Sequence, residues 1–325
     1  MSERVGGPAQ GAGSGSASGE TRPVRLVLPA TSANLGPGFD AVGLALALTL
    51  TVDAEVNAAE DSPRLVIEAS GRNADRIART QNNMIFETYR DVLEHAGRRV
   101  MPLRLRLANE IPLGMGCGSS AAALLAGVML ANHFGGLGWS LNACIDEATR
   151  REGHPDNVAA CALGGFTVSA VDESGAVVAA SCGVKLPWKL FLALPSTSLA
   201  TERARALLPS AYSRADAVAN IQRAALLVAA FSQGRGELLR VAMQDRLHQP
   251  YRMEACPLLP RLLPMAGEPC IYGVALSGAG PGVLVIAAPD ADSARLTARI
   301  RAAGSDSNLE VVETTAGRGA NLAFA

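Results

Sequence analysis

The sequence predicts an α+β fold, in which strands and helices mix without a regular alternation. A strand pattern runs from residue 102 to 107, where Leu103, Leu105 and Leu107 alternate with two arginines. A long apolar helix pattern at residues 121–131 follows it. In the second half of the chain, predicted strands and helices intermix with no sustained strand–helix alternation, which argues against a doubly wound sheet.

The composition is typical of a folded chain that is long enough for two packed domains. Of its 325 residues, 49% are hydrophobic and 18% are charged, and the formal net charge is −1. No Lys/Arg cluster interleaves with aromatic residues, so we expect no nucleic-acid partner. The apolar runs are too short for a bilayer and no leader opens the chain, so we expect no membrane partner and a cytoplasmic location. Six cysteines without a C-x-x-C pair suit buried thiols in a reducing compartment.

The order of the predicted elements suggests a tail and two domains. Residues 1–22 are rich in glycine, serine and alanine and should form a flexible tail. We expect a first domain over residues 23–165, with strands at 24–28, 41–52, 64–69 and 102–107 and helices at 82–96, 121–131 and about 141–151. A second domain over residues 166–325 should have strands at 166–170, 190–194, 272–276 and 283–287 and helices at about 200–207, 216–233, 236–243 and 291–303.

A glycine-rich segment joins the strand at 102–107 to the helix that follows. It consists of Pro112, Leu113, Gly114, Met115, Gly116, Cys117, Gly118, Ser119, Ser120, Ala121 and Ala122. Glycine lets a ligand approach the main chain closely, and Ser119 or Ser120 is a candidate cap for the helix, whose first N–H groups then face the loop. The segment is therefore either a phosphate-binding loop or a turn that packs the helix onto the sheet. It has neither the P-loop lysine nor the G-x-G-x-x-G spacing.

Two other segments carry clustered polar side chains. Residues 29–40 are turn-rich between two strands, so Asn34 and Asp40 belong either to a binding loop or to a surface hairpin. Glu152, His154 and Asp156 are close neighbours in the sequence. Taken alone, that cluster is either a polar loop or part of a functional site.

Several of these segments resemble motifs of the GHMP small-molecule kinases. Residues 112–122 resemble the phosphate loop of the family, with Cys117 where leucine is usual. Pro-Ala-Thr-Ser-Ala-Asn-Leu-Gly-Pro-Gly-Phe-Asp at 29–40 and Glu-Gly-His-Pro-Asp-Asn-Val at 152–158 resemble the homoserine kinase branch. Ser-Gly-Ala-Gly-Pro-Gly at 277–282 resembles the third family motif and should pack under the phosphate loop. The resemblance covers residue 24 to about 315. It implies a nucleotide domain similar to ribosomal protein S5, followed by a ferredoxin-like domain.

The resemblance also implies that the chain uses ATP and Mg²⁺ to phosphorylate L-homoserine. Backbone amides from Gly114 to Ser120 would cradle the phosphates, and Asn83 would contact the adenine. Magnesium takes oxygen ligands, so Ser119 or Ser120 together with Glu152 would hold it, with Glu147 as the rival carboxylate.

The acceptor would be bound through its charged ends. Arg205 and Arg252 align with arginines that hold the substrate carboxylate, a role suited to a guanidinium. Asp40 with Asn34 would meet the ammonium group at the opposite end. The residue before Pro250, usually glutamate in the family, is Gln249, which changes a neighbouring charge.

The catalytic base is an open question. Glu152, His154 and Asn157 are the candidate catalytic residues, and His154 is also a candidate for binding the substrate. The resemblance places Asn157 where some GHMP kinases have an aspartate that takes the hydroxyl proton, so the reaction would rest on positioning and electrostatics. Asp156 is the alternative base.

Two other functions remain open from the sequence. One is a GHMP kinase for another small alcohol, such as mevalonate or shikimate. The other is a non-catalytic nucleotide-binding or S5-like RNA-binding module. Asp40 and the segment from His154 to Asn157 favour an amino-acid substrate, and the lack of a basic excess argues against RNA. The resemblance to the family also implies that the protein forms a homodimer.

Overall fold

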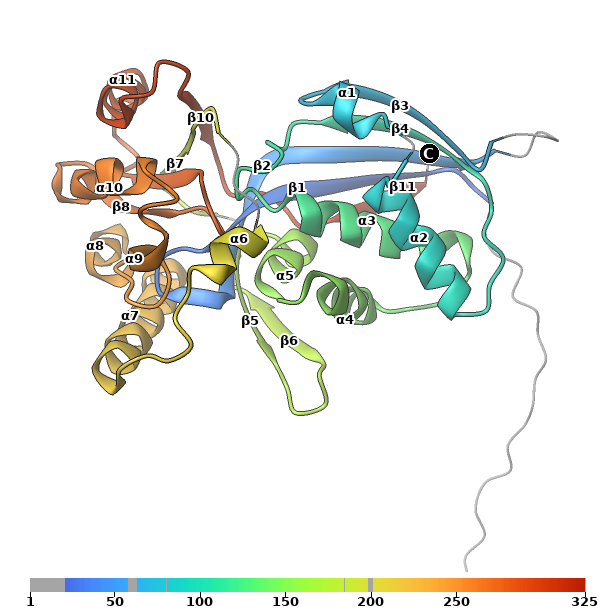
Figure 1. Cartoon of the computed structure of the whole chain (residues 1–325), viewed down its shortest axis with the longest axis horizontal. Coiled ribbons are helices and arrows are strands. Elements are labelled where there is room, and N and C mark those ends of the chain that lie inside the picture. Colours follow the sequence, from blue (N-terminus) through green and yellow to red (C-terminus); the bar gives the residue numbers. More distant parts are fainter. Residues whose placement is uncertain (1–20, 58–62, 80, 184, 198–200, 325) are drawn as a thin grey trace, which may run out of the picture.

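The computed structural model describes residues 21–57, 63–79, 81–183, 185–197 and 201–324. The predicted tail at 1–22 thus lies outside the described residues, apart from Thr21 and Arg22. The described chain forms a seven-stranded and a four-stranded sheet with helices packed around them (Figure 1). This mixture confirms the predicted α+β class. None of the described helices is long and apolar enough to cross a membrane.

The larger sheet has the strand order β11-β1-β2-β4-β3, with β5 paired to β2 and β6 paired to β5. Its strands are β1 (Val24–Asn34), β2 (Gly38–Val56), β3 (Leu65–Gly71), β4 (Leu103–Asn109), β5 (Phe166–Val171), β6 (Val177–Ser181) and β11 (Asn321–Phe324). Leu103, Leu105 and Leu107 of β4 are buried while the arginines between them are more exposed, as the alternation predicts.

Four helices lie along one face of this sheet (Figure 1). They are α2 (Met84–His95), α3 (Ser119–Phe134), α4 (Leu141–Glu152) and α5 (Asp156–Leu163), and a short α1 (Ala74–Ile77) follows β3. The buried face of α3 is built from alanine and leucine, which lets the helix sit deep in the core. At Gly127 the helix α2 comes so close that a Cβ would lie 2.6 Å from the carbonyl oxygen of Ile85.

The smaller sheet has the order β10-β7-β9-β8, with β7 (Lys189–Leu194), β8 (Ile271–Leu276), β9 (Val283–Ala287) and β10 (Glu310–Thr314). The helical elements around it are α6 (Thr201–Ala206), α7 (Arg214–Gln233), η1 (Gly236–Leu238), α8 (Leu239–Ala242), α9 (Gln249–Arg252), α10 (Leu258–Leu262), η2 (Leu263–Gly267) and α11 (Ser293–Gly304). Phe191, Leu259 and Ile300 are among the residues that form a second hydrophobic cluster here. Helix α6 lies between the two halves of the molecule (Figure 1).

The structure corrects the expected loop at residues 29–40. Strand β1 continues to Asn34 and β2 starts at Gly38, so only a short turn separates them. Thr31, Ser32 and Ala33 pair with residues of β2 and are buried, because small side chains fit where the sheet is covered. Asn34, Leu35 and Asp40 have positive φ angles of 70°, 45° and 55°, so the backbone reverses tightly here.

The expected boundary after residue 165 stays a prediction. The sheets themselves do not divide at that residue, since β5, β6 and the C-terminal β11 all belong to the larger sheet. The two halves are therefore joined by backbone pairing as well as by side-chain packing.

Candidate active site

The glycine-rich segment forms an irregular loop between β4 and the start of α3. Gly114, Gly116 and Gly118 have φ angles of 72°, 72° and 66°, a left-handed conformation that glycine adopts at little cost. Alternation of such residues turns backbone N–H groups toward one side, which makes an anion-binding concavity. The predicted capping by Ser119 or Ser120 is wrong. The cap position is Gly118, which has no side-chain cap, so both serines are first-turn residues of α3.

The segment at 277–282 packs under this loop, as expected. The hydroxyl of Ser277 donates to the carbonyl of Gly116 at 2.8 Å, and Gly282 N–H donates to the carbonyl of Met115 at 3.3 Å. A Cβ on Gly116 would lie 1.9 Å from the Ser277 carbonyl oxygen, so only glycine fits. Cys117 is 1% exposed and packs in the core, and burial raises the pKa of its thiol to about 12. It is an apolar filler, as expected for a replacement of leucine.

Ser120 and Glu152 meet at the edge of the loop. The Ser120 hydroxyl donates to Glu152 Oε2 at 2.7 Å, joining the start of α3 to the end of α4. Two oxygen atoms of the kind that a hard cation binds thus lie together. The rival, Glu147, accepts hydrogen bonds of 2.8 Å from both Arg150 and Arg151. Although burial opposes ionisation, these two arginines lower the pKa of Glu147. The carboxylate is thus committed to a local ion-pair cluster.

Two cavities meet at the glycine-rich segment, the predicted phosphate loop, and share Gly114, Ser119 and Ser120. The smaller has a volume of about 80 Å³ and collects most of the predicted acceptor-site residues: Asn34, Asp40, Glu152, His154, Asp156, Asn157, Arg205 and Arg252. The larger has a volume of about 400 Å³ and includes Asn83. A large and a small cavity that share a phosphate loop suit a nucleotide and a small acceptor. In this structure, the Asn83 side chain accepts from Phe86 N–H and caps α2.

The segment that contains His154 forms a buried polar network. His154 Nδ1 lies 2.8 Å from Asp156 Oδ1, which also accepts from the Asn157 backbone and side chain. Burial opposes protonation of His154, but the hydrogen bond and charge of Asp156, with the charge of Glu152, raise its pKa. Asn157 Oδ1 accepts a 2.6 Å hydrogen bond from the hydroxyl of Thr31. Both groups of the Asn157 amide are thus engaged.

Thr31 is a site residue that sequence reasoning missed. It is 0% exposed, its amide donates to the Cys117 carbonyl at 3.0 Å, and a Cβ on Gly118 would lie 1.8 Å from its hydroxyl oxygen. It therefore links β1, the phosphate loop and Asn157. The only sequence signal was its place inside the motif at 29–40.

The structure corrects the expected separation of the charged groups. Asp40 Oδ1 lies 2.5 Å from Arg205 Nη2, so these two are paired and do not stand at opposite ends. The guanidinium carbons of Arg205 and Arg252 both lie 5.4 Å from the centroid of the Phe39 ring, so the arginines converge. The Asn34 side chain donates to the Gly278 carbonyl at 2.9 Å and accepts from the Asp40 amide at 3.0 Å. It thus holds the turn in place, and the Asp40 amide takes one of the two acceptor positions of its carbonyl oxygen.

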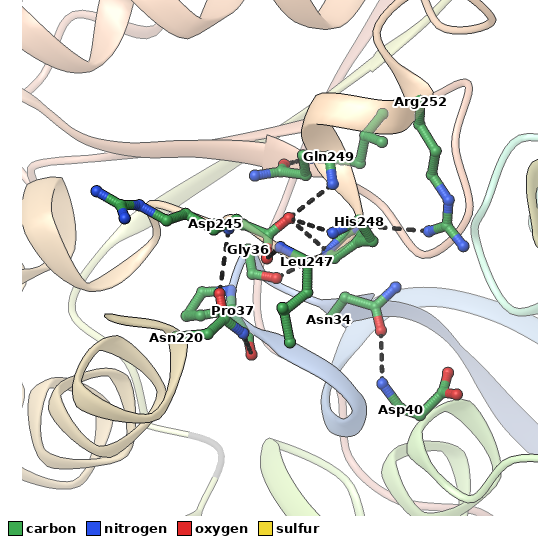
Figure 2. A network of polar contacts seen from close by, with 12 residues as sticks. Asn34, Gly36, Pro37, Asp40, Asn220, Asp245, Leu247, His248, Gln249 and Arg252 are labelled. Atoms are coloured by element: carbon green, nitrogen blue, oxygen red, sulfur yellow. Dashed lines mark hydrogen bonds and ion pairs between the residues drawn. The ribbon is translucent and has the colours of Figure 1, made fainter. Parts of the chain in front are cut away.

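Arg252 is 1% exposed and is held by two contacts, of which Figure 2 shows the one to His248. Its Nε donates to the carbonyl of Ala204 at 3.2 Å, and its Nη1 lies 3.1 Å from His248 Nδ1. The preceding Gln249 is buried and its Oε1 accepts from Leu276 N–H at 2.8 Å. The contact needs an acceptor and not a charge, which explains why glutamine serves where glutamate is usual.

Comparison with known proteins agrees with this arrangement. The family models described as the GHMP kinases N terminal domain and the GHMP kinases C terminal match residues 83–165 and 227–306. The homoserine kinase of Solibacter usitatus is 47% identical over 260 residues, which cover 80% of this chain and 84% of that protein. The homoserine kinase of Synechocystis is 40% identical over 270 residues, with the same coverage. The chain belongs to the homoserine kinase family of the GHMP kinases.

The solved structures show how widely this fold is shared. The homoserine kinase of Cytophaga hutchinsonii has a TM-score of 0.77 at 24% identity and covers 93% of this chain and 98% of its own. The L. major mevalonate kinase has a TM-score of 0.68 at 14% identity over 90% of this chain and 95% of its own. The expected GHMP kinase fold is confirmed. At these identities the likeness speaks for the fold alone, so the acceptor has to be argued from the site.

Proposed function

We propose that this member of the homoserine kinase family transfers the γ-phosphoryl group of ATP to the side-chain hydroxyl of L-homoserine. The products would be ADP and O-phospho-L-homoserine, an intermediate of threonine biosynthesis. One observation carries the proposal beyond family membership: a small cavity beside the phosphate loop gathers two arginines and three carboxylates, Asp40, Glu152 and Asp156. Groups of both signs suit a zwitterion, whereas a substrate with only a carboxylate needs no acidic partner.

The nucleotide would occupy the larger cavity, with its phosphates on the loop from Gly114 to Ser120. Ser120 and Glu152 fit Mg²⁺, because their oxygen atoms lie 2.7 Å apart at the junction of the two cavities. When bound, the ion would neutralise charge on the phosphates. The protein itself supplies the backbone N–H groups of the loop and the dipole of α3.

Homoserine would replace the ion pair between Asp40 and Arg205 with contacts to its own charged groups. Asp40 and Arg205 are paired within the cavity, and a zwitterion can give each of them a new partner: the ammonium for Asp40 and the carboxylate for Arg205. Arg252, fixed by Ala204 and His248, would hold the carboxylate from the other side. With the ammonium and the carboxylate both held at the α-carbon, the hydroxyl at the other end would be directed toward the loop.

We assign no general base to this reaction. Asn157 is uncharged, and Asp156 Oδ1 already accepts from His154 and from two groups of Asn157. Asp156 would thus orient its neighbours. A loose transition state for phosphoryl transfer needs little help with deprotonation. The hydroxyl proton would pass to an oxygen of the transferred phosphoryl group as the new O–P bond forms.

A panel assay tests the substrate. ADP release would be measured with L-homoserine, mevalonate, shikimate and no acceptor. We expect release well above the blank with homoserine alone. Equal rates with all acceptors would instead indicate an ATPase or a nucleotide-binding module, and preference for mevalonate or shikimate would identify another GHMP kinase. A homodimer is also proposed from the family, and analytical ultracentrifugation would measure it.

A further inference from the structure

The turn from Asp245 to His248 lies behind Arg252, and the fully buried side chains at its two ends have no part in the motifs of the sequence. Asp245 Oδ1 accepts from the amide of Leu247 at 2.9 Å, and its Oδ2 accepts from those of His248 and Gln249 at 2.9 and 2.6 Å (Figure 2). These bonds fix the backbone at the start of α9. The side chains of Asp245 and His248 are both 0% exposed.

The partners of His248 determine where its proton lies. Nε2 is 2.7 Å from the carbonyl oxygen of Gly36, which can only accept, so Nε2 carries the hydrogen. Nδ1 is 3.1 Å from Nη1 of Arg252, which can only donate, so Nδ1 offers its lone pair. Both contacts are satisfied together only by a neutral ring with the hydrogen on Nε2.

The surroundings of the ring support this state. The charged groups that face it are Asp245 from the turn before α9, Arg252 from α9 and Asp40 from β2. Burial lowers the pKa of His248 and the charge of Arg252 lowers it further, against the opposing charges of the two carboxylates. The Phe39 ring stacks on the imidazole with centroids 5.2 Å apart, so the ring is also held from its face.

We propose that His248 is a positioning residue for acceptor recognition. Its neutral imidazole accepts a hydrogen bond from Arg252 and aims the guanidinium into the acceptor cavity, while Nε2–H ties this arrangement to Gly36 in the β1–β2 turn. The same turn carries Asn34 and leads to Asp40. The His248 ring thereby fixes the position of Arg252 relative to the β1–β2 turn and to Asp40, which follows that turn. The inference rests on the proposed function, because it takes Arg252 to meet the substrate carboxylate.

Two substitutions separate the two nitrogens. His248→Asn places an amide oxygen near the Nδ1 position and keeps an acceptor for Arg252. His248→Gln places an amide nitrogen near the Nε2 position and keeps the donor to Gly36 but loses that acceptor. We expect His248→Gln to raise the KM for homoserine roughly three- to tenfold, the size of one hydrogen bond, with the KM for ATP unchanged. His248→Asn should retain most of the homoserine affinity.

A second acceptor distinguishes positioning from general damage to the fold. In 2-amino-1,4-butanediol a hydroxymethyl group replaces the carboxylate, so the substrate offers Arg252 no charge. The kcat/KM for this diol should be the same in the wild type and in His248→Gln. Equal losses on both acceptors, or a loss in His248→Asn as large as in His248→Gln, would overturn the proposal. His95→Gln, at the exposed end of α2, is the matched control and should change neither KM.

A measurement without substrate keeps this inference separate from the proposed function. Nitrogen NMR of the His248 ring reports which nitrogen carries hydrogen. We expect protonated Nε2 and unprotonated Nδ1 at neutral pH. A ring protonated on Nδ1 would overturn the positioning role, even in a protein that phosphorylates homoserine. Failure of the wild type to use homoserine would instead count against the proposed function.

Discussion

Ser120 Oγ donates a 2.7 Å hydrogen bond to Glu152 Oε2 and so joins the start of α3 to the end of α4. The two residues are far apart in the sequence, and both line the smaller cavity. Of the two serines left open by the sequence, Ser120 is therefore the one beside the carboxylate proposed to hold magnesium. Glu147 points to a different cluster, with Arg150 and Arg151.

Glu152→Gln should lower turnover strongly and change ATP affinity only modestly. The substitution removes the charge of a proposed metal ligand but leaves the backbone cradle for the phosphates intact. Steady-state kinetics at varied Mg²⁺ concentration would measure it, with a raised Mg²⁺ requirement expected. Glu147→Gln is the matched control and should be near neutral in activity. If Glu147→Gln lost more activity than Glu152→Gln, Glu147 would be the metal ligand instead.

Gly116→Ala should destabilise the protein and weaken ATP binding. Its Cβ would collide with the carbonyl of Ser277 under the phosphate loop, at a φ of +72°. Gly138→Ala is the control, because Gly138 has a φ of +67° but nothing within 4 Å of its Cβ position. The control should lose only about 1–2 kcal/mol, the cost of the left-handed conformation. Melting temperature and ATP titration check both variants, and equal losses would show that the contact with Ser277 is unimportant.

Asp40→Ala should penalise homoserine far more than 4-hydroxybutyrate, which has the hydroxyl and carboxylate but no amino group. Loss of a charge-assisted contact is worth about 1.5–3 kcal/mol, or on the order of ten- to more than a hundredfold in kcat/KM. Arg252→Lys should weaken binding of both acceptors, since it removes the guanidinium that meets the carboxylate.

The matched control for this ion pair is Asp53→Ala. Asp53 forms a 2.6 Å ion pair with Arg25 on the larger sheet, among residues that do not line the acceptor cavity. It should leave the kinetics with both acceptors unchanged. Equal losses on the two acceptors in Asp40→Ala would mean that Asp40 serves only to hold Arg205.

His248 should make the folded protein less stable in acid. Burial lowers the pKa of this ring in the folded state, so below about 6.5, the ordinary pKa of histidine, the unfolded chain binds a proton that the folded chain excludes. Stability is therefore lost as the pH falls through this range. Thermal unfolding of the wild type and of His248→Gln should differ less at about pH 5.5 than at about pH 7.5. A difference that grows in acid would contradict the neutral, buried ring.

The sequence predicts the fold best where apolar patterns are strong. Strand β9 has the expected bounds, Val283–Ala287, because a continuous apolar run lies between glycine and proline segments. Strands β6, β10 and β11 were missed, since they are short and largely exposed and carry little apolar pattern. Helix α5 was also missed, because the polar motif from His154 to Asn157 runs into its first turn and hides the apolar turn that follows.

The sequence predicted which residues belong to the candidate site better than it predicted the contacts among them. The motifs single out five residues that line one cavity in the structure: Asp40, His154, Asn157, Arg205 and Arg252. They do not show that Asp40 is paired with Arg205, because that contact joins β2 to α6 across the chain. Among the supporting residues, Thr31 lies inside the motif at 29–40 but does not stand out in it, and Asp245 and His248 lie in no motif. An aspartate shortly before Pro250 in α9 was the available signal for the buried turn, since acidic residues and proline favour helix starts.

Phosphorus NMR of a reaction with ATP, Mg²⁺ and L-homoserine tests the proposed transfer most directly. It distinguishes phosphate attached to an alcohol from phosphate released to water, which an ADP assay cannot do. We predict a phosphomonoester resonance that grows in step with ADP and is absent when homoserine is omitted. ADP that accumulates with inorganic phosphate alone, or no ADP at all, would contradict the assignment of this chain as a homoserine kinase.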